Sequence, residues 1–517
     1  MKRYLFTLIL ILSCVQATVY AQKISWGKAF AADKSYSPII IEEEGDFFYT
    51  YDYSSKELLL EKFDKKNSSA VYSKKYEIPK RHEFELIAVA DKKVIVFFSF
   101  YDSKKSSAEI YCNTYSTTDG VILESNHTIS SVPSEDNRDY NGYSFSVYKS
   151  DDNKWILVTN RLYTKKEDVN KTYFILLNEK LSKIFEKTEN TGKDRLILDD
   201  MIIGNDGSCY FQKTITGGDG TKLVSLDADK SFKEYEYGLD EAKLKVPQNA
   251  SIRFPNIALN KKGELVLVSQ YVKDRVFSGY FFVSIDTKTK KIVSSKINEF
   301  DDKLVNQFRT EREIEKGKKT KVPEYFTNIH FIAKEDGGMI GITGGVQRII
   351  TQTRTTNQQG FSSYDQIGDA VIYHNVMALN FSSDGTLLWA NRIPRYQSYS
   401  SRRWWAPRKN ADYLSSFSVL TNDKLYIAYH DHLSNLALKS DSERVKGFRM
   451  SKKAVVELFT IDLKTGQKDK RQFTEGTDAE TFLEPAKAFQ KSQNSDMIIL
   501  GSKKTKFKFG VMSFAKS

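Results

Sequence analysis

Cysteine and histidine are scarce in this chain of 517 residues, which has three of the first and six of the second. No spacing between them resembles a zinc site, so no metal and no cofactor is expected. Cys14 lies within the first 21 residues. Cys112 and Cys209 belong to two strand repeats of the chain that are not adjacent in sequence. We therefore expect two buried free thiols rather than a disulfide.

Long apolar runs are missing beyond the first 21 residues. The chain begins MKRYLFTLILILSCVQATVYAQ, with two cations, a short apolar run, and small residues at Val19 and Ala21 before Gln22. This pattern predicts a signal peptide over 1–21 and a soluble, exported chain in the periplasm or at the cell surface of a Gram-negative bacterium. The alternative is a lipoprotein anchored at Cys14 and associated with the membrane surface.

Helical periodicity is nearly absent, whereas short alternating runs of Val, Ile, Phe and Tyr recur along 22–517. Eight times an apolar strand and a short polar turn precede a stronger apolar strand. The stronger strands begin at Phe47, Val94, Trp155, Ser208, Leu265, Met339, Leu425 and Met497. Their spacing suits four-stranded antiparallel blades, so we expect an all-β chain that forms one β-propeller.

A hairpin with a tight polar turn follows in each of the first seven repeats, as in DTKTK from Asp286 and DLKTG from Asp462. In the eighth repeat, KFKFGVMSFAK runs to the C-terminus without a partner, and KISWGKAF at the mature N-terminus resembles the fourth strand LLWANRI of repeat six. Pairing the two chain ends would remove an exposed strand edge. This predicts eight blades in a closed ring; seven is the alternative.

Two hairpins carry a resemblance to a known group of proteins. LNFSSDGTLLWANRI (379–393) and FTIDLKTGQKDKRQF (459–473) resemble the strand, Asp-x-x-x-Gly turn and Trp-containing strand of quinoprotein-like β-propellers. That group includes pyrroloquinoline-quinone alcohol dehydrogenases and non-enzymatic envelope scaffolds. The chain has no adjacent cysteine pair and no regular tryptophan set of the dehydrogenase kind, so the resemblance implies the non-enzymatic branch.

Strand direction assigns the long insertions to one face of the ring. In an antiparallel blade the second turn and the link to the next blade lie on the face opposite the first and third turns. Four long insertions occupy such positions, at 301–321, 353–369, 396–410 and 431–453. Together they carry a net charge of +8, against +10 for residues 22–517, so most of the excess charge is expected on this face.

The segment SSRRWWAPRKN within these insertions combines cations with aromatic rings, which suits an anionic partner that also offers a flat or apolar face. The candidate binding residues are Tyr396, Tyr399, Arg402, Arg403, Trp404, Trp405, Arg408 and Lys409. The alternatives without a binding role are that the tryptophans fold inward and that the cations form a solvated surface.

These features favour an exported binding or scaffold propeller that recognises a protein or an anionic glycan. The competing hypothesis is a carbohydrate-active enzyme with its site at the channel mouth, where Asp199 and Asp200 on the first strand of blade four are the best candidate carboxylates. Export argues against a nucleic-acid partner. The sequence predicts no catalytic residue, and it does not define the oligomeric state.

Two further motifs could indicate a metal site or a glycan-cleaving enzyme, but neither is complete. His430 and His432 flank Asp431 at the end of a strand, so both imidazoles would lie on one side and could share a metal, but no third ligand is identifiable. SSDGTLLW (382–389) is similar to the sialidase Asp-box but lacks one residue between Asp384 and Gly385. Because that box is a structural turn, the motif indicates a propeller hairpin and not glycan cleavage.

Overall fold

The computed structural model describes most of the chain after the predicted signal peptide. The described residues are 23–32, 36–102, 104–133, 145–164, 169–214, 221–227, 232–235, 246–308, 313, 315–316, 322–323, 326, 329–356, 362–401, 414–438, 443, 445–448, 454–474, 482–491, 496–503 and 505–513. Within them, no helix is long and apolar enough to cross a membrane.

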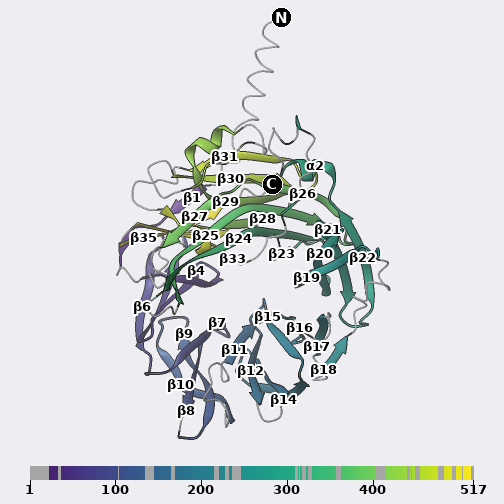
Figure 1. The fold of residues 1–517 in the computed structure, drawn as a ribbon. Coiled ribbons are helices and arrows are strands. Elements are labelled where there is room, and N and C mark those ends of the chain that lie inside the picture. Colours follow the sequence, from purple (N-terminus) through teal and green to yellow (C-terminus); the bar gives the residue numbers. More distant parts are fainter. Residues whose placement is uncertain are drawn as a thin grey trace, which may run out of the picture.

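Eight antiparallel sheets form a ring, which confirms the predicted eight-bladed propeller and excludes seven blades (Figure 1). From blade one to blade six, the first strands of successive blades contact one another around the centre. In blades one to seven these are β3 (Ile39–Glu44), β7 (Glu83–Ala90), β11 (Phe145–Lys149), β15 (Arg195–Ile203), β19 (Ala250–Leu259), β23 (Ile329–Ala333) and β28 (Ser416–Leu420).

The second strands are the stronger apolar strands of the sequence pattern, and all eight lie where the spacing predicts them. In blades one to seven they are β4 (Phe47–Tyr53), β8 (Lys93–Asp102), β12 (Trp155–Thr164), β16 (Cys209–Thr214), β20 (Glu264–Lys273), β24 (Met339–Thr356) and β29 (Lys424–His432). Their long apolar runs are buried because neighbouring blades cover both faces.

The third and fourth strands form the predicted hairpins. The third strands are β5 (Glu57–Asp64), β9 (Ser107–Ser116), β13 (Val169–Asn178), β17 (Thr221–Leu226), β21 (Val276–Asp286), β25 (Ser362–Phe381) and β30 (Ala454–Asp462). The fourth strands are β6 (Ala70–Glu77), β10 (Ile122–Pro133), β14 (Lys183–Gly192), β18 (Phe232–Tyr235), β22 (Ile292–Glu299), β26 (Leu387–Ile393) and β31 (Lys468–Thr474).

The eighth blade joins the two chain ends, as predicted. Its first position is shared by β32 (Phe482–Leu483) and β33 (Phe489–Gln490), which both pair with β34 (Met497–Lys503). The last strand, β35 (Lys506–Ser513), pairs with β1 (Lys23–Trp26) and β2 (Phe30–Ala31). A strand from the N-terminus therefore covers the edge that the C-terminal strand would otherwise expose.

The apolar core is divided into clusters that lie between neighbouring blades. One cluster joins β8 and β9 of blade two to β12 and β13 of blade three, and another joins β4 and β5 of blade one to β34 and β35 of blade eight. Since each blade buries its faces only against its neighbours, the blades depend on an unbroken ring.

The turns between third and fourth strands fasten each blade to the blade before it. Tyr76 of blade one donates a hydrogen bond to the carbonyl of Gly120 in blade two. In the same way, Trp389 Nε1 of blade six donates to Leu463 O of blade seven at 2.9 Å. These polar contacts add a fixed register to the apolar packing between blades.

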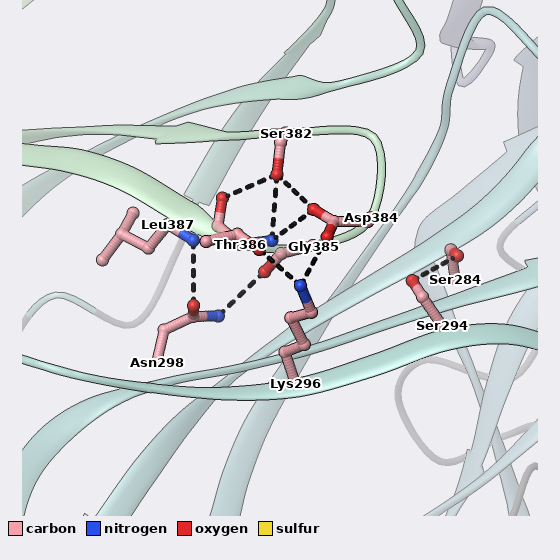
Figure 2. A network of polar contacts seen from close by, with 9 residues as sticks. All are labelled: Ser284, Ser294, Lys296, Asn298, Ser382, Asp384, Gly385, Thr386 and Leu387. Carbon is pink, nitrogen blue, oxygen red and sulfur yellow. Dashed lines mark hydrogen bonds and ion pairs between the residues drawn. The ribbon is translucent and has the colours of Figure 1, made fainter. Parts of the chain in front are cut away.

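Figure 2 shows this joint between blades five and six, at the Asp-box-like turn of 382–386. Asp384 accepts hydrogen bonds from Ser382 and from the Thr386 amide, and it forms an ion pair with Lys296 of β22. Asn298 of β22 donates to Gly385 O at 3.0 Å and accepts from the Leu387 amide at 2.8 Å. These partners hold the pKa of Asp384 well below its usual range, led by the hydrogen bond from Lys296.

Gly385 offers a test of this joint. Its φ is +82°, and an added Cβ would lie 2.2 Å from Cδ1 of the buried Phe282 in blade five. Gly45 also has a positive φ, of +57°, but open space around it. Left-handed backbone costs an alanine about 1–2 kcal/mol, and overpacking at Gly385 adds about 1–3 kcal/mol.

We therefore expect Gly385→Ala to lower the free energy of unfolding by about 2 kcal/mol more than Gly45→Ala. Chemical denaturation of both variants measures this difference. Equal losses in the two variants would show that the turn does not press on blade five.

Candidate functional site

The loop face differs from the sequence expectation in the described part of segment 353–369. Instead of forming a loop, β24 and β25 continue as a hairpin far beyond blade six, with pairing from Val346↔Tyr373 to Thr356↔Ser362. β27 (Gln397–Ser401) adds a third strand by pairing with Asp369–Tyr373 of β25. We call residues 346–356, 362–373 and 397–401 the blade-six annex.

The residues of the annex explain why it forms strands. VQRIITQTRTT on β24 is rich in threonine, isoleucine and valine, whose branched side chains favour extended backbone. Only β25 Val376–Phe381 pairs with β26, so the annex extends the blade on one face of the ring without taking part in the four-stranded sheet.

Two other insertions also begin with ordered elements. α2 (Asp302–Asn306) opens segment 301–321, and its N-cap is Asp301, which accepts from the Leu304 amide at 2.8 Å. In segment 431–453, β29 ends at His432 and a 3-10 helix, η2 (Leu433–Ala437), follows.

The predicted binding residues are described only in part. Tyr396 is 37% exposed, and its carbonyl accepts from the Phe448 amide at 2.9 Å. Tyr399 lies on β27 with its backbone opposite Val371. The remaining six candidates, Arg402, Arg403, Trp404, Trp405, Arg408 and Lys409, lie outside the described residues, and their role stays a prediction.

Gln397 fixes the base of the annex to blade seven. Its side chain is fully buried; Nε2 donates to His430 O at 2.8 Å and Oε1 accepts from the Ser415 amide at 2.9 Å. The backbone of Gln397 also forms an isolated parallel bridge with Phe448. The segment that carries the six remaining candidates therefore leaves from the annex and returns at Leu414 beside it, where Leu414 packs with Phe448.

Arg395 lies just before the annex strand β27, between blades six and seven. Only 3% of its surface is exposed. Nε donates to His374 O at 2.9 Å, and Nη1 donates to Ser416 Oγ at 3.2 Å. Cζ lies 5.5 Å from the centre of the Tyr373 ring. Burial lowers the pKa of Arg395 to about 10, although the guanidinium remains charged at neutral pH.

A pair of buried carboxyl groups lies on β29 and β30 of blade seven. Asp431 and Glu457 are each 1% exposed and share a hydrogen bond. Asn435 Nδ2 donates to Asp431 Oδ1 at 2.7 Å. The Tyr429 hydroxyl donates to the carbonyl of Pro394 and lies 3.1 Å from Glu457 Oε2. Burial first, and mutual repulsion with Glu457 second, raises the pKa of Asp431, so the pair retains a proton at neutral pH.

This pair should make stability fall as the pH rises. Both carboxyls ionise near pH 4 in the unfolded chain, whereas the native pair keeps a proton up to its raised pKa. The native state therefore binds more protons, and stability decreases with pH over that window. An amide at position 431 removes this proton uptake and can still accept from Asn435.

We expect Asp431→Asn to raise the free energy of unfolding at pH 8 by about 2 kcal/mol and to flatten its decline between pH 5 and 8. Denaturant titrations across this range measure both effects. Asp469→Asn, an exposed position in the same blade, is the matched control and should change neither. A parallel decline in wild type and Asp431→Asn would contradict the shared proton.

The two histidines around Asp431 have separate structural partners. His430 Nε2 lies 2.7 Å from Leu483 O in blade eight, and His432 Nδ1 accepts from the Ser434 amide to cap η2. Among the described residues, no group of three or more histidine, cysteine, aspartate or glutamate side chains could hold a metal ion. The described geometry thus gives each imidazole a hydrogen-bonding role.

The remaining candidates from the sequence are the two cysteines and the two adjacent aspartates of blade four. Cys112 and Cys209 are buried free thiols, as predicted, and burial raises the pKa of Cys112 to about 12. Asp199 and Asp200 lie on β15, the first strand of blade four, but their side chains are not among the described ones. They remain untested as a channel site.

Sequence reasoning missed a charged cluster near the axis on the short-turn face. Glu42 of β3 is only 5% exposed. Its Oε1 lies 3.0 Å from Lys491 Nζ of blade eight, and its Oε2 accepts from Asn153 Nδ2 of blade three at 2.6 Å. A carboxylate that joins three blades could not be found from sequence, because its partners lie more than 100 residues away.

The described geometry defines the class of protein as an eight-bladed β-propeller. The sequence matches no family of known proteins and no curated protein. Solved structures with some likeness include a europium-containing methanol dehydrogenase (10% identity, 92% of this chain and 84% of that chain, TM-score 0.39) and the Dos1 propeller (8%, 94% and 95%, 0.38). The WD40 domain of SCAP from fission yeast is a third (9%, 96% and 99%, 0.35).

Proposed function

We propose that the chain is an exported, non-catalytic binding propeller that holds a partner on the loop face of blades six and seven. The observation that carries this proposal is the blade-six annex, in which β24, β25 and β27 extend beyond the four-stranded blade. Ordering these strands costs conformational entropy, and the annex takes no part in closing the ring. Elements of this kind on a rigid scaffold commonly serve recognition.

The predicted binding segment supports the same face. The segment between β27 and β28 carries the predicted binding residues, and its described ends, Ser401 and Leu414, lie at the annex. These residues are Arg402, Arg403, Trp404, Trp405, Arg408 and Lys409. Cations and tryptophans in one segment suit a protein or an anionic glycan. In this proposal the chain belongs with the non-enzymatic quinoprotein-like propellers and works in the periplasm or at the cell surface, free or anchored through Cys14.

The direct test is partner recovery from the envelope of the source organism. A Trp404→Ala, Trp405→Ala double variant should recover the partner at least tenfold less efficiently than wild type, because it removes the largest aromatic surface of the segment. Lys180→Ala, at an exposed turn of blade three, is the control and should recover it fully. Circular dichroism and the melting temperature establish that both variants are folded.

A second variant tests the annex itself. Replacing residues 347–372 by an Asn-Gly turn keeps the Val346↔Tyr373 pair and removes most of the annex. If the folded double variant and the folded annex deletion both recover the partner as well as wild type, the loop face is not the binding surface.

A further inference from the structure

We infer that Arg395 recognises the carboxylate of a sugar acid in an anionic glycan that this propeller holds. The inference rests on the proposed function, and it names the ligand class and the residue that selects it. Arg395 lies at the foot of the annex, next to the predicted binding residue Tyr396.

Among the described residues, no carboxylate serves as a counter-ion for the buried charge of Arg395. Its side-chain acceptors are the His374 carbonyl and the Ser416 hydroxyl, both neutral. No carboxylate of the described residues forms an ion pair with it, whereas the buried Lys213 lies 3.2 Å from Asp194 Oδ2 and the buried Lys334 lies 3.4 Å from Asp336 Oδ2. Because an unpaired buried charge is costly, an anion from outside would remove a penalty that the described residues leave in place.

The guanidinium also has one nitrogen without a partner among the described residues. Nε and Nη1 are used within the protein, whereas Nη2 donates to none of the described acceptors. Nη2 lies against Gly344 of β24, where an added Cβ would be 2.9 Å away. A larger residue would therefore press on this nitrogen. Arginine offers its donors in a fixed planar fork that matches a carboxylate better than the point charge of lysine does.

Aromatic rings beside Arg395 favour a sugar over a peptide. The Tyr373 ring lies under the guanidinium, and the Tyr396 ring, 37% exposed, stands edge-on to the His374 ring at 5.9 Å. Burial, and secondarily the Arg395 charge, lowers the pKa of His374, so its ring is neutral at pH 7. A sugar acid presents a carboxylate together with an apolar ring face and hydroxyl groups, which match a cation flanked by rings.

The experiment measures binding of the mature chain to a glucuronate-containing oligosaccharide by isothermal titration calorimetry. A neutral glucose oligosaccharide of equal length is the ligand control, and an acidic peptide is the alternative ligand. Wild type should bind the acidic sugar at least tenfold more tightly than the neutral one. Arg395→Gln should lose at least tenfold in affinity for the acidic sugar, and Arg395→Lys should lie between it and wild type.

Arg392→Gln is the matched control variant. Arg392 is a neighbouring arginine whose Nη2 donates to Asn375 Oδ1 at 3.1 Å and whose Cζ lies 5.4 Å from the Phe308 ring. Its removal should leave the affinity unchanged. If Arg395→Gln does not fold, melting temperatures of wild type and Arg395→Lys replace it as the test. The acidic sugar should raise both melting temperatures, and the neutral sugar should raise neither.

Three results would overturn the inference: no binding of the acidic sugar by wild type, equal binding by folded Arg395→Gln, or preferential binding of the acidic peptide through Arg395. Partner recovery by the Trp404→Ala, Trp405→Ala variant shows whether only the role of Arg395 is wrong or whether the proposed binding face is wrong as well. If recovery still depends on the tryptophans while Arg395 proves irrelevant, the face binds a partner but not through this carboxylate contact.

Discussion

The antiparallel pairing of β35 with β1 holds the ring closed, and the rest of the structure depends on it. The large apolar clusters of the described residues lie between neighbouring blades, so an open ring would expose an apolar face at each end. The pairing supplies hydrogen bonds for the last strand, and Glu42 strengthens the same junction through Lys491 of blade eight. The polar joints between successive blades then transmit one fixed register around the ring.

Closure also decides where long extensions of the blades can lie. Antiparallel strands place second turns and inter-blade links on one face, so extensions of blades five to seven are brought together there. The blade-six annex is the largest described extension, and Gln397 and Arg395 join its base to blade seven. The long elements on this face are therefore held by buried contacts at their base.

Buried charges are handled differently in different parts of the molecule. The carboxylate of Glu42 has a cation and an amide as partners, and the Asp431–Glu457 pair lowers its charge by keeping a proton. Arg395 has only neutral acceptors among the described residues. Of these buried charges, that of Arg395 is the one that the described residues leave without an opposite charge or a shared proton.

The sequence predicts most of the ring and little of its chemistry. Alternating apolar strands, Asp-x-x-x-Gly turns and the unpaired last strand are local signals, and they give the blade number and the closure. The annex escaped prediction because its threonine- and serine-rich strands lack the apolar alternation of a buried blade. Glu42 and Arg395 escaped because burial of a charge is decided by partners that are distant in sequence, and not by the residues beside it.

The binding face is the central claim, and hydrogen–deuterium exchange with and without the partner recovered from the envelope tests it most directly. The structure predicts slower exchange at amides of 344–356, 370–375 and 395–401 when the partner is bound. Protection confined to the short-turn face, at 44–47 and 151–155, with no change in the annex, would contradict it.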